Sequence, residues 1–409
     1  MAKRVRVLHV YPGFLKQLHN TTIPIHRDRT GNRPLRTRLT DLATSFVFPK
    51  NRKLRPFKFR TPEQVVQEML DVFYHLPNVT DYHIMWSGLQ PIPNSSPVPL
   101  LAALFHGPAL RTLSLEISLE NIQSLLTPAQ HIRNLEELTL TLRLDHDHNI
   151  LHDHAHILTH HLAPAISHLH PSLRKLTIQS WEAHDLAPLF RALAFLPHLH
   201  HLTLSVPIQP PHLGHPRAIA AFLHRQRTTL HSLALRTTQY SGSGLVPDPS
   251  SLDAWITAAL THTPLPALAT LDMSSPLLPP SASLACLRHF ARGIKSLGVT
   301  GRYQAHDDVQ QVVRAFRGAG AALGEGGLET LRLGSVSLTP QLVDLLASEM
   351  PGLDRLELLV RDLGPSSMAG GGLLDVDKEA ACMYVVDQSV HVTNQTVSRI
   401  FSCLLRERC

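Results

Sequence analysis

The chain has 409 residues, of which 43% are hydrophobic and 17% charged, and its net charge is +6. This composition excludes an intrinsically disordered chain, and the length exceeds what one hydrophobic core usually organises, so we predict several domains or one repetitive array. Four cysteines without a Cys-x-x-Cys pair indicate neither a disulfide framework nor a zinc knuckle.

The first 60 residues carry most of the positive charge, with 15 Lys and Arg against 2 Asp and Glu. That balance of +13 leaves −7 for the rest of the chain. Proline and glycine interrupt residues 11–60, which we interpret as a basic insertion or loop. Two interpretations of its charge stay open, a solvated loop or a contact with an acidic protein. Nucleic acid is not favoured, because no recognition motif accompanies the charge.

The sequence contains no indication of a membrane protein. No apolar stretch of secretory length follows the basic start, and no 18 consecutive apolar residues occur anywhere. We therefore expect a cytoplasmic or nuclear protein without a membrane partner.

A short apolar motif recurs along the chain, with apolar residues at the first, fourth and sixth positions of a six-residue segment. Weak copies begin at Val5 and Val79. Nine further copies begin at Leu110, Leu135, Leu173, Leu199, Leu230, Leu268, Ile294, Leu328 and Leu353. From Val79 onward the copies lie 25 to 38 residues apart, about 30 on average. Such a period is typical of a solenoid of stacked repeats.

Proline indicates the same repeat independently. It stands two residues before the first apolar position in six copies. Because proline cannot continue a helix and biases the preceding residue to extended backbone, it predicts a helix end followed by a strand. Amphipathic helices are predicted ahead of such prolines over residues 61–76, 186–196 and 339–350. Thr61 and Thr339, each followed by proline, are the expected N-caps of the first and third of these helices.

Each unit is thus helix, tight turn and short strand, with the strands forming a parallel sheet on the concave side and the helices on the convex side. Side chains alternate along a strand, so the residue between the second and third apolar positions projects from the concave surface. We predict that a protein partner binds there, although for any single residue a solvated strand position is the favoured explanation. The candidates are Ser114, Thr139, Thr177, Thr203, Ala234, Asp272 and Arg332.

At these apolar positions the chain resembles the leucine-rich-repeat superfamily, and its irregular units over residues 61–364 resemble those of fungal F-box/leucine-rich-repeat proteins. The resemblance implies an α/β leucine-rich-repeat solenoid whose repeat surface presents a substrate, while an N-terminal F-box docks the Skp adaptor of a cullin ubiquitin ligase. No F-box opening of the form Leu-Pro-x-Glu is visible. Two expectations therefore stay open, the substrate-recognition part of an F-box-type adaptor or a stand-alone scaffold.

Histidine is the most conspicuous polar residue, with 28 copies and a concentration over residues 146–161. A spacing of four, at 148, 152, 156 and 160, would place imidazoles on one helix face, as metal ligation requires. Histidine is nevertheless spread through the whole chain, and no cysteine or glutamate completes a coordination shell. We therefore predict no metal site and no cofactor, and we expect adventitious zinc or nickel binding or a pH-sensitive surface.

No catalytic motif is present: there is no phosphate-binding glycine loop, no Gly-x-Ser-x-Gly and no His-Glu-x-x-His. We therefore expect that the protein is not an enzyme. Trp181 and Trp255 are either binding anchors or core residues, and the core is favoured. Residues 365–372 resemble a linker, and we expect 365–409 to be a poorly ordered tail.

Overall fold

The computed structural model describes residues 5–10, 76, 78–85, 110–119, 122, 132, 134–143, 154–182, 185–207, 214–236, 249–274, 280–301, 303–320, 327–363 and 389–393. Within these ranges the strands form one sheet whose spatial order follows the chain. The strands are β1 (Val7–Val10), β2 (Asp81–Met85), β3 (Thr112–Ser118), β4 (Glu137–Arg143), β5 (Lys175–Ser180), β6 (His201–Ser205), β7 (Ser232–Arg236), β8 (Thr270–Asp272), β9 (Ser296–Val299), β10 (Thr330–Leu338), β11 (Arg355–Leu363) and β12 (Ser389–Thr393).

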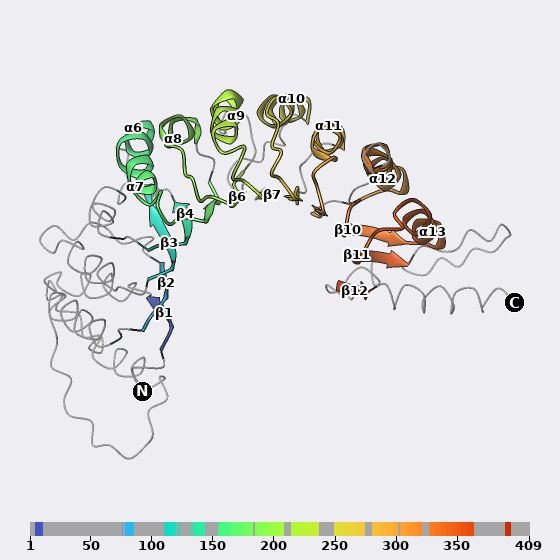
Figure 1. Cartoon of the computed structure of the whole chain (residues 1–409), viewed down its shortest axis with the longest axis horizontal. Coiled ribbons are helices and arrows are strands. Elements are labelled where there is room, and N and C mark those ends of the chain that lie inside the picture. The colour runs from blue at the N-terminus through green and yellow to red at the C-terminus, as the bar shows by residue number, and fades with distance from the viewer. Residues whose placement is uncertain are drawn as a thin grey trace, which may run out of the picture.

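Strands β1 to β11 are all parallel to their neighbours, whereas β12 runs antiparallel to β11. Helices follow the strands from β4 onward, and Figure 1 shows them on the outer side of an arc with the sheet on the inner side. The helical segments are α6 (His154–Ile157), the π-helical turn η4 (Leu158–Leu162), α7 (Ala163–His168), α8 (Ala187–Ala192), α9 (Pro216–Arg225), α10 (Pro249–Leu260), α11 (Pro280–Phe290), α12 (His306–Gly320) and α13 (Pro340–Glu349).

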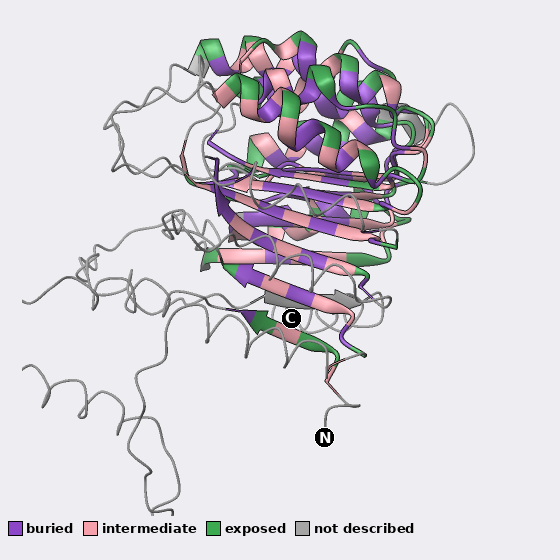
Figure 2. Ribbon diagram, turned by 90° about the vertical axis from the view of Figure 1, so that its left-hand side faces the viewer, coloured by how far each residue is buried: buried purple, intermediate pink, exposed green. Residues whose placement is uncertain are grey.

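The core lies between the sheet and the helices. In β4, Leu138, Leu140 and Leu142 are buried, while the residues that alternate with them are half-buried. The same alternation recurs along the sheet, as the colours of Figure 2 show. Parallel register stacks the leucines of successive strands on one another, so the core is one continuous cluster rather than a set of separate ones. The predicted solenoid with a concave parallel sheet is confirmed.

One backbone arrangement repeats at the start of every strand from β2 to β11. Two consecutive N–H groups donate to a single carbonyl of the preceding repeat, as Glu136 and Glu137 do to Arg111 O at 2.8 and 2.9 Å. The accepting carbonyls belong to Arg6, Thr80, Arg111, Glu136, Arg174, His200, His231, Ala269, Lys295 and Glu329. This pairing sets the register, which must hold because a slip of one residue would turn every apolar side chain to the wrong face.

Two of the predicted helices are described. Helix α13 begins as expected, because Thr339 Oγ1 accepts a hydrogen bond from Leu342 N at 3.1 Å and Pro340 occupies the first turn. Helix α8 ends at Ala192, four residues earlier than predicted. Arg225 of the next repeat donates to the carbonyls of Phe190 and Leu193, at 2.7 and 3.1 Å, and at Phe190 it takes the place of the Ala194 N–H that a longer helix would supply. The helix predicted over 61–76 lies outside the described residues.

Glycine is required where two strands approach closely beside the irregular pairing of β10. A Cβ on Gly334 would lie 2.6 Å from the Cα of Thr300, which is backbone and cannot move aside. Gly334 sits where the register between β10 and β11 shifts. Absence of a side chain there lets β10 bend without separating from the neighbouring repeat.

Of the region after residue 364, the structure describes residues 389–393. They form β12, which pairs antiparallel with β11 from Arg355 to Leu359. The sequence did not predict this strand, since it carries no repeat motif. The basic insertion over 11–60 and the linker over 365–372 lie outside the described residues. Within the part of the chain that is described, no helix has the length and apolar character needed to cross a bilayer.

The stacked core predicts a large stability difference between two neighbouring residues of β4. Leu140 is 1% exposed, so Leu140→Ala should lower the free energy of unfolding by about 2 to 5 kcal/mol through lost burial and a cavity. Thr139→Ala, on the opposite face, should change it by less than about 0.5 kcal/mol. Urea unfolding followed by circular dichroism measures both, and equal midpoints for the two variants would contradict the assigned faces.

Candidate functional site

The structure brings all seven predicted surface residues into one line across the concave face. Each pairs in register with the next, with Gly298 inserted between Asp272 and Arg332. His9 and His83 extend the line at one end and Glu357 at the other. The resulting concave row consists of His9, His83, Ser114, Thr139, Thr177, Thr203, Ala234, Asp272, Gly298, Arg332 and Glu357.

Two of the seven residues are less exposed than predicted. Thr177 and Ala234 lie on the expected face, but they are 6% and 7% exposed and therefore buried. The prediction that they project into solvent is wrong, whereas Ser114, Thr139 and Thr203 are half-buried and accessible.

The middle of the concave row is small and uncharged. From β3 to β7 it presents serine, three threonines and alanine. Ion pairs between adjacent strands border this strip: Lys175 Nζ lies 2.9 Å from Glu137 Oε2, and Arg143 Nε lies 3.1 Å from Glu116 Oε1. The strip is thus a band of short side chains between charged ones. A polypeptide backbone can approach the sheet along it.

Asp272 and Arg332, the charged candidates, are already paired within the protein. Arg236 donates to Asp272 Oδ2 from Nε and Nη2, at 3.1 and 3.0 Å, and Ser274 Oγ donates to Asp272 Oδ1. Arg332 Nε lies 2.9 Å from Glu357 Oε1. These contacts tie neighbouring repeats together, so a partner that used either charge would have to share it with the existing pair.

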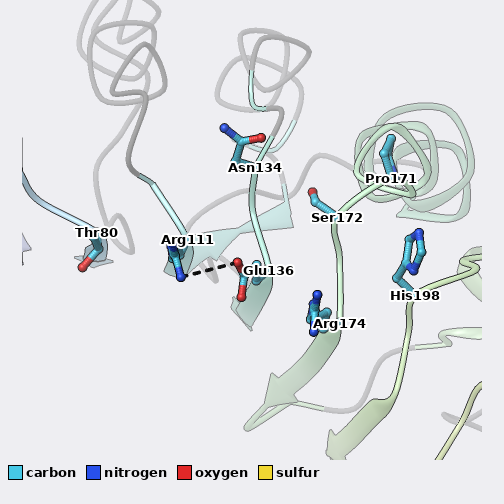
Figure 3. Close-up of a pocket in the computed structure, with 8 residues that line it drawn as sticks. All are labelled: Thr80, Arg111, Asn134, Glu136, Pro171, Ser172, Arg174 and His198. Carbon is cyan, nitrogen blue, oxygen red and sulfur yellow. Dashed lines mark ion pairs between the residues drawn. The ribbon is translucent and has the colours of Figure 1, made fainter.

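A second surface lies at the amino ends of the strands, where the sequence predicted none. Two adjoining hollows of about 420 and 690 Å³ share Thr80, Arg111 and Glu136. Figure 3 shows Glu136 between Arg111 and Arg174, with the Arg111–Glu136 ion pair dashed. We call the joined hollows the amino-edge groove, lined by Arg6, Asn78, Thr80, Asp81, Arg111, Thr112, Asn134, Glu136, Glu137, Pro171, Ser172, Arg174 and His198.

Sequence reasoning missed this groove because it concentrated on residues inside the strands. Arg111, Glu136 and Arg174 each directly follow the first apolar residue of a motif copy. That position recurs once per repeat, so its side chains form a second line beside the sheet. Comparing the residue types at that one position would have found the groove.

Histidines continue this line beyond the groove. The rings of His200 and His231 lie 4.9 Å apart edge to face, and Nδ1 of each lies within hydrogen-bonding distance of Thr229 O, at 3.0 and 2.6 Å. His201 begins β6 beside them. Burial lowers the pKa of His201, nearby His200, Lys175 and His231 lower it further, and Glu137 opposes them.

This environment predicts a pH dependence of stability. Because the pKa of His201 is lower in the folded than in the unfolded protein, the unfolded chain takes up a proton first as pH falls through about 6.5. Stability should therefore decline with acidification in that range, and His201→Gln should show a smaller decline. Thermal unfolding at about pH 8 and pH 5.5 measures this, with the higher pH as control. Identical declines in the two proteins would refute the role of His201.

In its described part, the histidine concentration places His156 beside His160, at the spacing of four that would put imidazoles on one helix face. Across the π-helical turn η4, His156 contacts both His160 and His161, with ring centroids 4.5 and 5.6 Å away. Residues 148 and 152 lie outside the described residues. Among those described, no three His, Cys, Asp or Glu side chains are placed to hold a metal ion.

The two tryptophans occupy different environments. Trp255 packs against the core and donates from Nε1 to Gly214 O at 2.9 Å, as the core interpretation predicts. Trp181 is 53% exposed at the carboxyl end of β5, so the core interpretation is wrong for it. Ser180 Oγ accepts from Glu182 N and donates to Glu182 O, a local turn that holds the strand end from which Trp181 projects.

Phenylalanine substitutions distinguish the two tryptophans. Trp255→Phe removes the bond to Gly214 O and should lower the free energy of unfolding by about 1 kcal/mol. Trp181→Phe should change it by less than about 0.5 kcal/mol, because the exposed ring has no such bond to lose. Chemical denaturation of both variants provides the test, and an effect at position 181 as large as that at 255 would contradict these environments.

Comparison with known proteins adds little to this geometry. No protein-family model matches the chain, and no curated protein matches it. Among solved structures, the chain is similar to one described as "Crystal structure of Rad7 and Elc1 complex in yeast", with a TM-score of 0.38 and 17% sequence identity over 76% of this chain and 79% of that chain. A similarity this low carries no functional argument. The repeat period, the parallel sheet and the outer helices define the fold as an α/β leucine-rich-repeat solenoid.

Proposed function

We propose that this protein is an interaction module that binds a protein partner on its concave face. The observation that carries the proposal is the concave row, which crosses the sheet without interruption from β1 to β11 while the helices stand on the opposite face (Figure 1). Strands lie about 4.8 Å apart, so the part from β3 to β10 spans roughly 34 Å. That length matches a protein–protein interface of ordinary size better than a small-molecule site.

The small side chains between β3 and β7 favour an extended polypeptide as occupant. Serine, threonine and alanine are short, and the first two carry hydroxyl groups. No bulky side chain keeps the main chain of a partner from reaching these hydroxyl groups. Charged pairs along the borders would then orient the partner rather than supply most of the affinity.

The finer proposal is that the chain is the substrate-recognition part of an F-box-type ubiquitin ligase adaptor. Its support is the resemblance of the repeat units over 61–364 to those of F-box/leucine-rich-repeat proteins. In the Rad7–Elc1 structure Rad7 is seen in a complex with Elc1, but that similarity is too low to add support. A stand-alone scaffold without a ligase link is the alternative. Affinity purification that recovers Skp and cullin subunits would favour the adaptor, and preys without them would favour the scaffold.

We also propose that the protein is not an enzyme, on the basis of the missing catalytic motifs. The environment of Cys286 agrees with this proposal, since burial, with a smaller contribution from Asp253, raises the pKa of its thiol to about 12. A thiol with that pKa is not a nucleophile near neutral pH.

Bulky charges in the concave row should abolish partner binding. Thr139→Arg combined with Thr203→Arg places two long, positively charged side chains among the short side chains of the concave row, where they would exclude the backbone of a partner. Ala221→Arg, an exposed position on the outer helix α9, is the matched control. Quantitative mass spectrometry of proteins captured by the tagged full chain should show preys lost at least about tenfold with the double variant and retained with the control.

Circular dichroism must first show that the double variant remains folded. If the specific preys are retained at parental levels by a folded Thr139→Arg/Thr203→Arg protein, concave-face binding is refuted. If Ala221→Arg alone caused loss of the preys, the interface would lie on the outer helices instead.

A further inference from the structure

The amino-edge groove contains carboxylates that are already engaged. Thr80 Oγ1 donates to Asp81 Oδ2 at 2.6 Å, and Lys175 pairs with Glu137 at 2.9 Å. Glu136 lies 3.8 Å from the guanidinium of Arg111. Every acidic group that lines the groove therefore has a partner within the protein.

The basic groups are not matched in the same way. Arg6 and Arg174 are exposed, line the groove and have no acidic partner among the described residues. Arg111 is 67% exposed and makes one long contact, so most of its donors remain available. Among the described residues, the groove therefore holds two guanidinium groups without an acidic partner, those of Arg6 and Arg174, and guanidinium groups prefer bidentate carboxylate partners.

Backbone carbonyl oxygens along the groove would repel an anion if they were free, but they are already hydrogen-bonded. The carbonyls of Arg6, Thr80, Arg111, Glu136 and Arg174 each accept two N–H groups of the next repeat. The side chains of Asn134 and His198 line the wall and add further potential donors. The groove thus offers N–H donors and guanidinium groups beside the engaged carboxylates of Asp81, Glu136 and Glu137.

The three arginines are also evenly spaced. Arg6, Arg111 and Arg174 directly precede or begin the turn into β1, β3 and β5, so two strand spacings, about 10 Å, separate each from the next. A peptide in the polyproline II conformation advances about 3.1 Å per residue with three residues per turn, so residues three apart lie on one side of it and span about 9 Å. Acidic residues at every third position would therefore meet successive arginines.

We infer that the amino-edge groove binds an acidic, extended segment of a protein partner, with carboxylates held by Arg6, Arg111 and Arg174. This inference rests on the proposed function as an interaction module, and it names a second surface and the chemistry of its occupant. The groove borders the concave row but shares no residue with it. A partner can use both surfaces together.

Direct binding of synthetic peptides to the full chain tests the inference. The probe is a fluorescent glycine peptide with aspartate at every third position, measured by anisotropy at low salt. Controls are the same peptide with asparagine and one with its aspartates adjacent. We expect the spaced acidic peptide to bind most tightly and to weaken as salt is added.

Arg174→Gln should weaken binding of the spaced peptide by about fivefold or more, because it removes one charge-assisted contact. Arg6→Gln, at the far end, should have a similar effect and serves if Arg174→Gln does not fold. Arg314→Gln, an exposed residue of the outer helix α12, is the matched control and should leave affinity unchanged.

No binding of the acidic peptide, or binding that Arg6→Gln and Arg174→Gln leave unchanged, would overturn the inference. So would an oligonucleotide of equal charge that binds more tightly through the same arginines, because the occupant would then be nucleic acid. Peptide affinity should survive Thr139→Arg/Thr203→Arg. The groove can therefore fail while concave-face binding holds, and the two failures are distinguishable.

Discussion

The structure depends on one repeated contact, in which two consecutive N–H groups at the start of each strand from β2 to β11 donate to a single carbonyl of the repeat before it. This contact fixes where each strand begins relative to its neighbour. Because side chains alternate along a strand, a fixed start also fixes which residues enter the core and which reach the concave face. Leu138 and Leu140 stack on Leu176 and Ile178, and Thr139 lies beside Thr177, for the same reason.

The connections at the two ends of the strands differ in how much their lengths vary. From helix end to strand start, the connections from α7–β5 to α13–β11 contain five to nine residues, whereas those from strand end to helix start, from β4–α6 to β10–α13, contain one to twelve. A short connection with a constant hydrogen bond holds its side chains at nearly the same height in each repeat. The amino edge is therefore a regular platform, on which a chemical pattern such as alternating arginines can be displayed at constant spacing. The unequal repeat lengths are absorbed mainly elsewhere in the unit.

Charge in the sheet serves two purposes. Cross-strand pairs such as Arg236–Asp272 and Arg332–Glu357 join adjacent repeats, and in a solenoid such nearest-neighbour contacts supply the cohesion that long-range packing gives a globular domain. Exposed pairs of this kind are individually weak. Arg6 and Arg174 form no such pair with any of the described residues, which is why we infer a partner site from them rather than from the more numerous paired charges.

The sequence by itself determined the architecture, because a period of about 30 residues and an apolar motif of fixed spacing leave one arrangement that buries every copy. It also determined the face of the concave row, since alternation is a local property. Only the tertiary structure decided which residues of that row are accessible, as Thr177 and Ala234 show, and that Trp181 is exposed while Trp255 is bonded to Gly214. The early end of α8, where Arg225 bonds to the Phe190 and Leu193 carbonyls, brings together residues far apart in the chain. So do the antiparallel pairing of β12 with β11 and the groove of Arg6, Arg111 and Arg174. No local pattern encodes them, because burial and charge pairing depend on neighbours that only stacking brings together.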